Sequence, residues 1–324
     1  MSTNKTAVVL FNLGGPDSEA AVEPFLFNLF NDPDIINFPL SFLFRRRLAR
    51  TISSKRAPRI VEQYNEIGGK SPIYELTKLQ AELLEAELNK EIDAKVFIAM
   101  RYWRPFTHQA VEEILKGDFR KVILLPLYPQ YSSSTTGSSY NEWKRAISRY
   151  PDLRNKTVLI RNYFDNEDYV DSIINRIDVG FRKFDEEKQK DVFVLFSAHG
   201  TPMKLVRQGD PYSSEIRKTV DAVAKRRGLT NYKLCWQSKV GPQKWLTPAT
   251  PDVIKETINE GYKNLLVVPI AFVSDHLETL FELGIEYRKE AMEAGAEKYI
   301  VTEGLNDSPL FIKALKNLVM KNLN

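Results

Sequence analysis

The sequence predicts an α/β protein built from two doubly wound domains, each a four-stranded parallel sheet flanked by helices. Short apolar and β-branched runs alternate with longer helical patterns along all 324 residues. Continuous apolar runs are typical of parallel strands that are buried on both faces. The eight runs also fall into two sets of four with similar flanking segments, so each set predicts one sheet.

The elements follow in chain order. Candidate strands cover 6–11, 95–101, 121–127 and 157–162, then 191–197, 232–236, 263–270 and 298–303. VVLFNLGGP at the first strand is similar to VFVLFSAHGTP, and KVILLPLYPQYSSST at the third is similar to KNLLVVPIAFVSDHLET. Two matches in the same order indicate a duplication. We expect domains at 1–160 and 161–304, a linker region near 160–190, and a C-terminal segment, 305–324, whose helix at 307–322 packs on one domain.

Composition excludes several classes of protein. The net charge of +4, from 46 basic and 42 acidic residues, is too small to indicate a nucleic-acid partner. The single cysteine, Cys235, excludes an intrachain disulfide and an all-cysteine metal site. The N-terminus lacks the pattern of a secretory signal, and no run approaches the roughly 18 apolar residues of a membrane span. We therefore expect a cytoplasmic protein.

Ionisable residues follow two strands of the second half. Ligands of open α/β sheets bind beyond the carboxyl ends of the strands, where the winding reverses. In a 2-1-3-4 order that point lies between the first and third strands. SAHG, with His199, follows the first strand, and SDHLE, with His276 and Glu278, follows the third. The first half places NLGGPD (12–17) and YPQYSSSTTGSS (128–139) there, without histidine.

The acidic segment predicts a helix from about residue 275, in which Glu278, Glu282 and Glu286 share one face. A solvated helix face is the alternative, above all for Glu286. Asp275, His276 and Glu278 directly follow a buried strand, so we expect them at the binding site. A row of carboxylates leading outward could pass cations or protons. His108, the third histidine, is expected to be an ordinary surface residue.

Seven segments together resemble ferrochelatase, the enzyme family that inserts ferrous iron into a porphyrin. Two of them are the signature-like FSAHGTPMKLVRQGDPY (196–212) and AFVSDHLETLFELGIEY (271–287). The others are FNLGGPDS, YNEIGGKSPI, MRYWRPF, LYPQYSSSTTGSS and CWQSKVGPQKWLTP, in the family's order. The resemblance covers nearly the full chain. It implies two facing Rossmann-like domains of the chelatase type with a porphyrin cleft.

The resemblance implies that His199 and Glu278 contact iron and handle the pyrrole protons. We assign His199 as the base and Glu278 as metal ligand and proton partner, with Asp275 and His276 orienting them and Glu282 continuing the acidic row. A neutral histidine accepts protons near physiological pH, and imidazole with carboxylate suits Fe(II). Which of the two takes the protons, and from which face iron enters, stays open.

The porphyrin contacts implied by the resemblance are six residues. Leu13, Tyr128, Trp245 and Phe272 would lie along the macrocycle, with Arg101 and Tyr102 nearby; core packing is the alternative for each aromatic residue. Fe(II) and porphyrin are then substrates, and no resident cofactor is expected. Some family members carry a [2Fe-2S] cluster on C-terminal cysteines, but this C-terminal segment contains none, so we predict no cluster.

The segment 25–50 places aromatic residues beside Arg45, Arg46, Arg47 and Arg50. One interpretation is an amphipathic helix packed on the first domain. The other is an apolar lip at the mouth of the pocket that also contacts an anionic membrane. The sequence does not indicate the oligomeric state or the iron donor.

Three alternatives to an iron and protoporphyrin enzyme remain. A related chelatase could insert another metal, since the ligand types do not separate Fe(II), Co(II) and Zn(II). The porphyrin could be coproporphyrin, although FNLGGP and YPQYSSSTTGSS resemble the protoporphyrin type. A non-catalytic haem or metal carrier is the third, and a stoichiometric product assay separates it from an enzyme.

Overall fold

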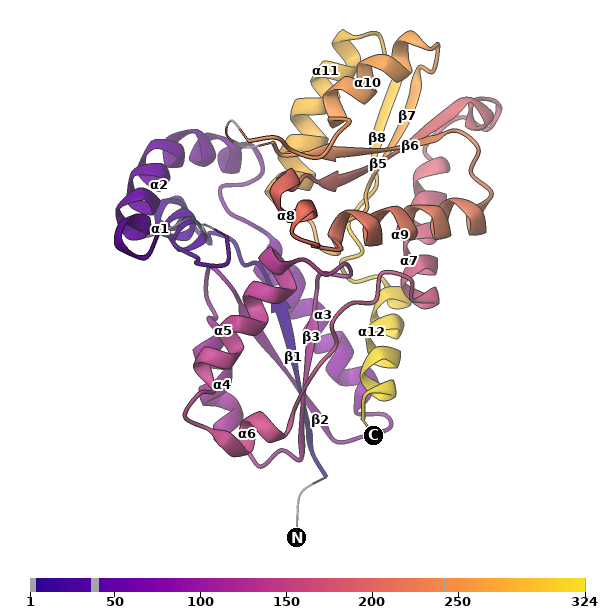
Figure 1. Ribbon diagram of the computed structural model, residues 1–324. Coiled ribbons are helices and arrows are strands. Elements are labelled where there is room, and N and C mark those ends of the chain that lie inside the picture. The colour runs from indigo at the N-terminus through magenta and orange to yellow at the C-terminus, as the bar shows by residue number, and fades with distance from the viewer. Residues whose placement is uncertain (1–3, 36–40, 240, 242, 324) are drawn as a thin grey trace. The chain divides into compact units, whose positions relative to one another are not determined.

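The computed structural model describes residues 4–35, 41–239, 241 and 243–323. The chain divides into two compact units (Figure 1). Unit 1 comprises residues 1–162 and 312–324, and unit 2 comprises residues 163–311.

Unit 1 contains a parallel sheet whose strands lie in the order β2-β1-β3-β4. In the register, Val9 of β1 lies opposite Phe97 of β2 and Leu124 of β3. The whole of β1 is buried because it has neighbours on both edges and helices on both faces. The strands are β1 (Thr6–Asn12), β2 (Ala94–Met100), β3 (Lys121–Pro126) and β4 (Thr157–Leu159).

Two layers of helices cover the sheet of unit 1 (Figure 1). On one face α4, α5 and α6 enclose a core in which Phe11 packs against the buried Trp143, with ring centroids 6.1 Å apart. On the other face lie α3 and α12. The helices are α1 (Glu19–Phe30), α2 (Ser41–Glu66), α3 (Ile73–Leu88), α4 (Thr107–Leu115), α5 (Ser138–Ala146), α6 (Pro151–Asn155) and α12 (Pro309–Lys321).

Unit 2 repeats the topology of unit 1, with strand order β6-β5-β7-β8. In Figure 1, α7 and α9 lie on one side of its sheet, and α10 and α11 on the other. The strands are β5 (Val192–His199), β6 (Tyr232–Gln237), β7 (Asn264–Pro269) and β8 (Lys298–Val301). The helices are α7 (Glu167–Phe181), α8 (Met203–Arg207), α9 (Tyr212–Arg227), α10 (Thr250–Asn259) and α11 (Tyr287–Glu293), with a 3-10 turn, η2 (Glu186–Asp191). The predicted fold class, two four-stranded parallel sheets in the switch-point order, is confirmed.

A π-helix follows the third strand of each unit. These are η1 (Ser133–Gly137), which continues into α5, and η3 (Glu278–Glu286), which continues into α11. The predicted ordinary helix from residue 275 is therefore wrong in its winding, because η3 is wound with i→i+5 hydrogen bonds. π-Helical segments are rare, and those found within α-helices are frequently at functional sites.

The region near 160–190, expected as a linker, contains the boundary between the two units, at 162/163, and a helix. Most of that region is α7, whose first turn is capped by Asn166, with the side-chain oxygen accepting the backbone N–H of Tyr169 at 3.0 Å. The helix buries Tyr169, Val170, Ile173 and Ile177. Such apolar spacing keeps the segment on the sheet.

Within the described residues no helix is long and apolar enough to cross a membrane.

Candidate active site

His199 ends β5, and its ring orientation is fixed by the backbone. Nδ1 lies 2.7 Å from the carbonyl oxygen of Gly200. A carbonyl oxygen only accepts hydrogen bonds, so Nδ1 carries the hydrogen. In the neutral ring the lone pair is then on Nε2, and the half-exposed side chain can present it as a base.

Phe272 contacts this histidine, and Trp245 packs at the next residue along the chain. The Phe272 ring lies edge-on to His199, with centroids 6.3 Å apart, and contacts His276, with centroids 4.3 Å apart. Trp245 packs at Gly200, where an added Cβ would lie 3.4 Å from the indole Cε3. The structure therefore brings together the ends of β5 and β7, as the switch point predicts.

His276 lies within hydrogen-bonding distance of Glu278. His276 is 6% exposed and its Nδ1 lies 3.0 Å from the carbonyl oxygen of Ser274, so Nδ1 is a donor. Its Nε2 lies 3.2 Å from Oε2 of Glu278. The imidazole is therefore held by a backbone carbonyl on one side and faces the Glu278 carboxyl group on the other.

Asp275 fixes the start of η3 to the loop after β8. Its carboxylate accepts the Asn306 amide at 2.7 Å, the Thr279 hydroxyl at 2.9 Å and the backbone N–H of Gly304 at 3.2 Å. Asp275 therefore supports the segment that carries Glu278 through Thr279.

Glu282 lies one turn further along η3, and its carboxylate is engaged within the fold. Oε1 accepts the Tyr287 hydroxyl at 2.7 Å and the Ser238 backbone N–H at 2.8 Å. Oε2 accepts the Gln237 amide at 2.9 Å and also the Ser238 hydroxyl. Burial raises the pKa of the Tyr287 phenol, and the neighbouring Glu282 charge raises it further, so the phenol stays a donor.

Two residues that hold this site were missed in the sequence. Tyr212, at the start of α9, donates its hydroxyl to the carbonyl oxygen of His199 at 3.0 Å. Gln237 contacts both β5 and η3. Both belong to segments that carry the family resemblance, but an uncharged side chain gives no chemical signal of its role. Burial raises the pKa of Tyr212, which keeps its hydroxyl protonated.

The candidate residues of unit 1 gather at the ends of β1 and β2. The backbone N–H of Tyr102 donates to Leu13 at 2.9 Å, and the Arg101 guanidinium lies 5.0 Å from the Tyr102 ring. Tyr128 is partly buried and packs at the edge of the α5 core. Tyr102 is 1% exposed, so its side chain belongs to the interior of the protein.

The buried carboxylate of Asp32 organises Arg101 and Tyr102. Arg101 Nη2 lies 2.9 Å from Asp32 Oδ2, and the Tyr102 hydroxyl donates to the same oxygen at 2.6 Å. Ser138 also donates to this oxygen and accepts from Arg101 Nε at 2.7 Å. Burial, with the adjacent Asp32 charge, raises the pKa of Tyr102 well above its ordinary value.

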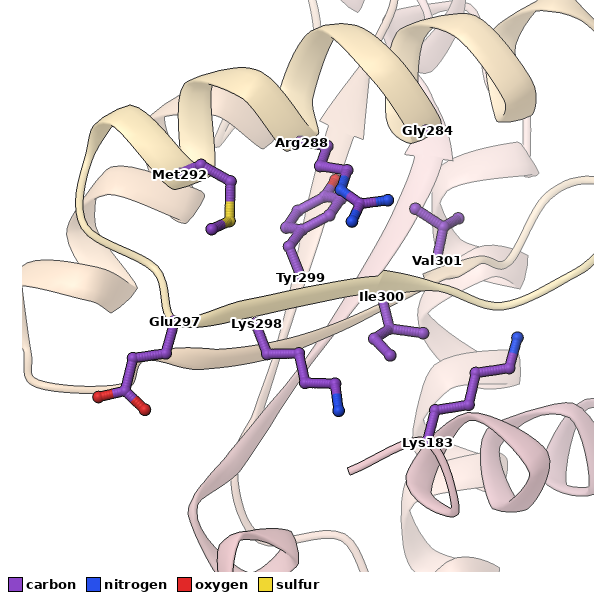
Figure 2. A pocket seen from close by; sticks show the side chains of 9 residues that line it. All are labelled: Lys183, Gly284, Arg288, Met292, Glu297, Lys298, Tyr299, Ile300 and Val301. Carbon is purple, nitrogen blue, oxygen red and sulfur yellow. The ribbon is translucent and has the colours of Figure 1, made fainter. Parts of the chain in front are cut away.

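A separate cavity of about 400 Å³ opens along the edge strand β8 (Figure 2). Arg288 and Met292 border it from the helix above the strand, whereas Lys298 and Ile300 point toward Lys183 on the other side. None of the site residues predicted from the sequence lines it. Among the residues that the structure describes, no three histidine, cysteine, aspartate or glutamate side chains are grouped so as to hold one metal ion.

Comparison with known proteins gives consistent relatives. A family model described as Ferrochelatase matches residues 5–323. Ferrochelatase of Geotalea daltonii is 45% identical over 317 residues, which is 98% of this chain and 98% of the relative. Ferrochelatase of Aquifex aeolicus is 44% identical over 315 residues, with 97% of this chain and 98% of the relative covered.

Solved structures share the fold at low sequence identity. SirB from Bacillus subtilis with Fe3+ has a TM-score of 0.58 at 14% identity, covering 98% of this chain and 95% of SirB. CbiX, the terminal enzyme for biosynthesis of sirohaem in denitrifying bacteria, has a TM-score of 0.52 at 12% identity, covering 99% of this chain and all of CbiX. These likenesses support the chelatase-like α/β architecture.

Proposed function

The chain belongs to the ferrochelatase family, and from this premise we propose that it inserts Fe(II) into protoporphyrin IX to give protohaem and two protons. The observation that carries the proposal is the orientation of His199, whose Nδ1 contact with Gly200 leaves the lone pair on Nε2, near the hydrogen-bonded pair His276 and Glu278. Metalation needs a base for the pyrrole protons and a weak ligand for the arriving ion.

His199 acts as the base and Glu278 as the ligand that delivers iron. The two pyrrole N–H protons leave in turn to Nε2 of His199, which releases the first to solvent before it accepts the second. Glu278 binds Fe(II) through its carboxylate, which His276 orients through Nε2, 3.2 Å from Oε2. Few ligands suit this task, because iron that is held by a full set of protein groups would not transfer to the porphyrin.

The apolar side chains support the porphyrin. Phe272 and Trp245 of unit 2 contact the macrocycle, and Trp245 Nε1 is buried without a hydrogen-bond partner in the described part of the chain. Leu13, Tyr128 and Arg101 are the porphyrin contacts proposed for unit 1. Tyr102 contributes by holding Arg101 through Asp32.

No resident cofactor is part of the proposal. Cys235 lies in the core of unit 2 with its thiol directed at the carbonyl oxygen of Phe196, 3.4 Å away. In this proposal Fe(II) is a substrate and not a resident cofactor.

The start of α2 supports peripheral membrane contact from the cytoplasm. Phe42, Leu43 and Phe44 are 70%, 60% and 57% exposed. Arg46 and Arg47 lie just beyond them and are also exposed. Exposed aromatic residues next to cations bind anionic lipid surfaces. By contrast Phe25 and Leu26 of α1 are buried, and residues 36–40 of the segment 25–50 lie outside the described residues, so the proposal rests on the start of α2. Flotation with anionic and with neutral vesicles tests this, and a Phe42→Ser/Phe44→Ser variant should lose the anionic-vesicle binding.

The catalytic proposal is tested by anaerobic incubation with Fe(II) and either protoporphyrin or coproporphyrin, following the porphyrin absorption bands. His199→Ala should lower kcat by at least about 10²-fold, the typical contribution of a positioned base, while porphyrin binding persists. His108→Ala is the matched control, since His108 is exposed and lies in unit 1. Full turnover of His199→Ala would refute the assignment. Stoichiometric binding without product in the wild type would indicate a carrier instead.

A further inference from the structure

Gln237, the last residue of β6, is hydrogen-bonded to both segments that carry the proposed chemistry. In the sheet register it lies opposite His199. Its side-chain oxygen accepts the Ser197 hydroxyl at 2.9 Å, and its backbone carbonyl accepts the N–H of Gly200 at 2.8 Å. It therefore holds β5 on both sides of His199.

The amide nitrogen of the same side chain faces η3. Nε2 donates to the backbone carbonyl of Glu278 at 3.2 Å and to Oε2 of Glu282 at 2.9 Å. Both partners only accept, so the orientation of the amide is fixed. Gln237 is 2% exposed, and water cannot replace these contacts.

We propose that Gln237 is a positioning residue that sets the placement of Glu278 relative to His199, with Glu282 as its anchor. The set of contacts from Gln237 to Ser197, Gly200, Glu278 and Glu282 is called the Gln237 bridge below. This inference rests on the proposed function. It gives Glu282 a task other than passing cations outward, because the carboxylate is already committed to donors of its own unit.

The backbone next to Gln237 supports this role. Ser238 has a φ of 64°, a left-handed conformation that residues other than glycine seldom adopt. Its N–H and hydroxyl both donate to Glu282. On the other side, a Cβ at Gly200 would lie 2.9 Å from the Gln237 carbonyl oxygen, so only glycine permits this approach. The backbone conformation at Ser238 and the close approach at Gly200 therefore restrict which residues can stand next to the Gln237 contacts.

The chemistry is sensitive to this spacing. His276 restrains the carboxylate of Glu278, whereas Gln237 restrains its backbone. A displacement of about 1 Å at a reacting group can reduce a rate by about 10²-fold. The loss should appear in kcat with little change in porphyrin KM, because Gln237 acts through Glu278 and is not among the proposed porphyrin contacts.

The experiment measures kcat and KM for Fe(II) insertion in Gln237→Leu, which removes all three side-chain hydrogen bonds at similar volume. Gly180→Ala is the matched control, because it crowds Leu266 in the same unit at 2.6 Å without touching the bridge. Per folded enzyme, determined by circular dichroism, Gln237→Leu should lose about 10²-fold in kcat with porphyrin KM within about threefold. Gly180→Ala should keep wild-type kcat.

A swap of the two partners provides the rescue. Gln237→Glu places a second carboxylate against Glu282, and the double variant Gln237→Glu/Glu282→Gln restores one amide and one carboxylate. The double variant should regain at least about tenfold in kcat over Gln237→Glu alone. A kcat for Gln237→Leu equal to that of Gly180→Ala, or no recovery in the swap, would overturn the positioning role. A wild-type enzyme without insertion activity would refute the proposed function and this role with it.

Discussion

Removal of the Asp32 carboxylate is predicted to destabilise unit 1 severely. Asp32 is 2% exposed, and its Oδ2 receives Arg101, Tyr102 and Ser138. In Asp32→Ala the Arg101 guanidinium, whose side chain is 11% exposed, would lose the carboxylate at 2.9 Å and keep only the longer contact with Glu142 at 3.8 Å. Removing one partner of a buried ion pair costs about 3–5 kcal/mol, and the remaining Glu142 contact places the loss toward the lower end. For a unit of this size the melting temperature should fall on the order of 10 °C.

The assay is thermal unfolding combined with amide hydrogen exchange of β1 and β3, which assigns the change to unit 1. Asp34→Ala is the matched control: it is the same substitution in the same loop, but Asp34 pairs with Arg145, whose side chain is 47% exposed. Asp34→Ala should lower the free energy of unfolding by about 1 kcal/mol or less.

A double-mutant cycle isolates the pair. In Asp32→Ala/Arg101→Ala no charge is stranded, so the double variant should be at least about 2 kcal/mol more stable than the sum of the single effects implies. Equal losses for Asp32→Ala and Asp34→Ala, or additive effects in the cycle, would show that the Arg101 charge is compensated elsewhere and refute the reasoning.

Three further predictions concern the interior of the protein. Gly180→Ala should lower the unfolding free energy of unit 2 by about 1–3 kcal/mol, because its Cβ would lie 2.6 Å from Leu266 Cδ1. Gly284→Ala, with a nearest contact of 3.4 Å, should leave the unfolding free energy roughly unchanged. Calorimetry of both variants checks this. Burial raises the pKa of Cys235 to about 12, so iodoacetamide should label it only after urea unfolding; labelling of the native protein at pH ~8 would contradict the burial. Burial also raises the pKa of Tyr102, Tyr163 and Tyr299. Each buried phenol therefore stabilises the fold below the unfolded pKa of about 10, and this stabilisation is lost as the pH rises above that value. At pH ~11 the free energy of unfolding should be lower by about 1.4 kcal/mol for each tyrosine. Their tyrosinate absorbance should therefore rise together with the loss of circular dichroism, and ionisation in a native-like state would disprove this.

The strands and the switch point could be predicted because both follow from local pattern and topology. The runs 192–196 and 265–270 are continuously apolar, and the polar residues that follow them include His199 at the end of β5 and His276 seven residues after β7. The meeting of these histidines at Phe272 follows once the strand order is known.

The winding of η3 could not be predicted in the same way. Glutamates at 278, 282 and 286 fit the spacing of an ordinary helix, and the π-turn depends on tertiary contacts at both ends, such as Asp275 to Asn306. The contacts of Asp32 with Arg101, Tyr102 and Ser138 could not be predicted from the sequence for a related reason. Its members are far apart in sequence, and only the folded sheet shows that an aspartate in the loop after α1 pairs with Arg101.

The two π-helices occupy equivalent positions in the two units. Each follows the third strand of its unit and continues into an α-helix, η1 into α5 and η3 into α11. A π-helix closes its turns with i→i+5 hydrogen bonds, so its backbone is wider than that of the α-helix that follows. Both switch points therefore share one departure from α-helical winding, although η1 carries hydroxyl groups and η3 carries carboxylates. The same backbone geometry thus presents two different chemistries.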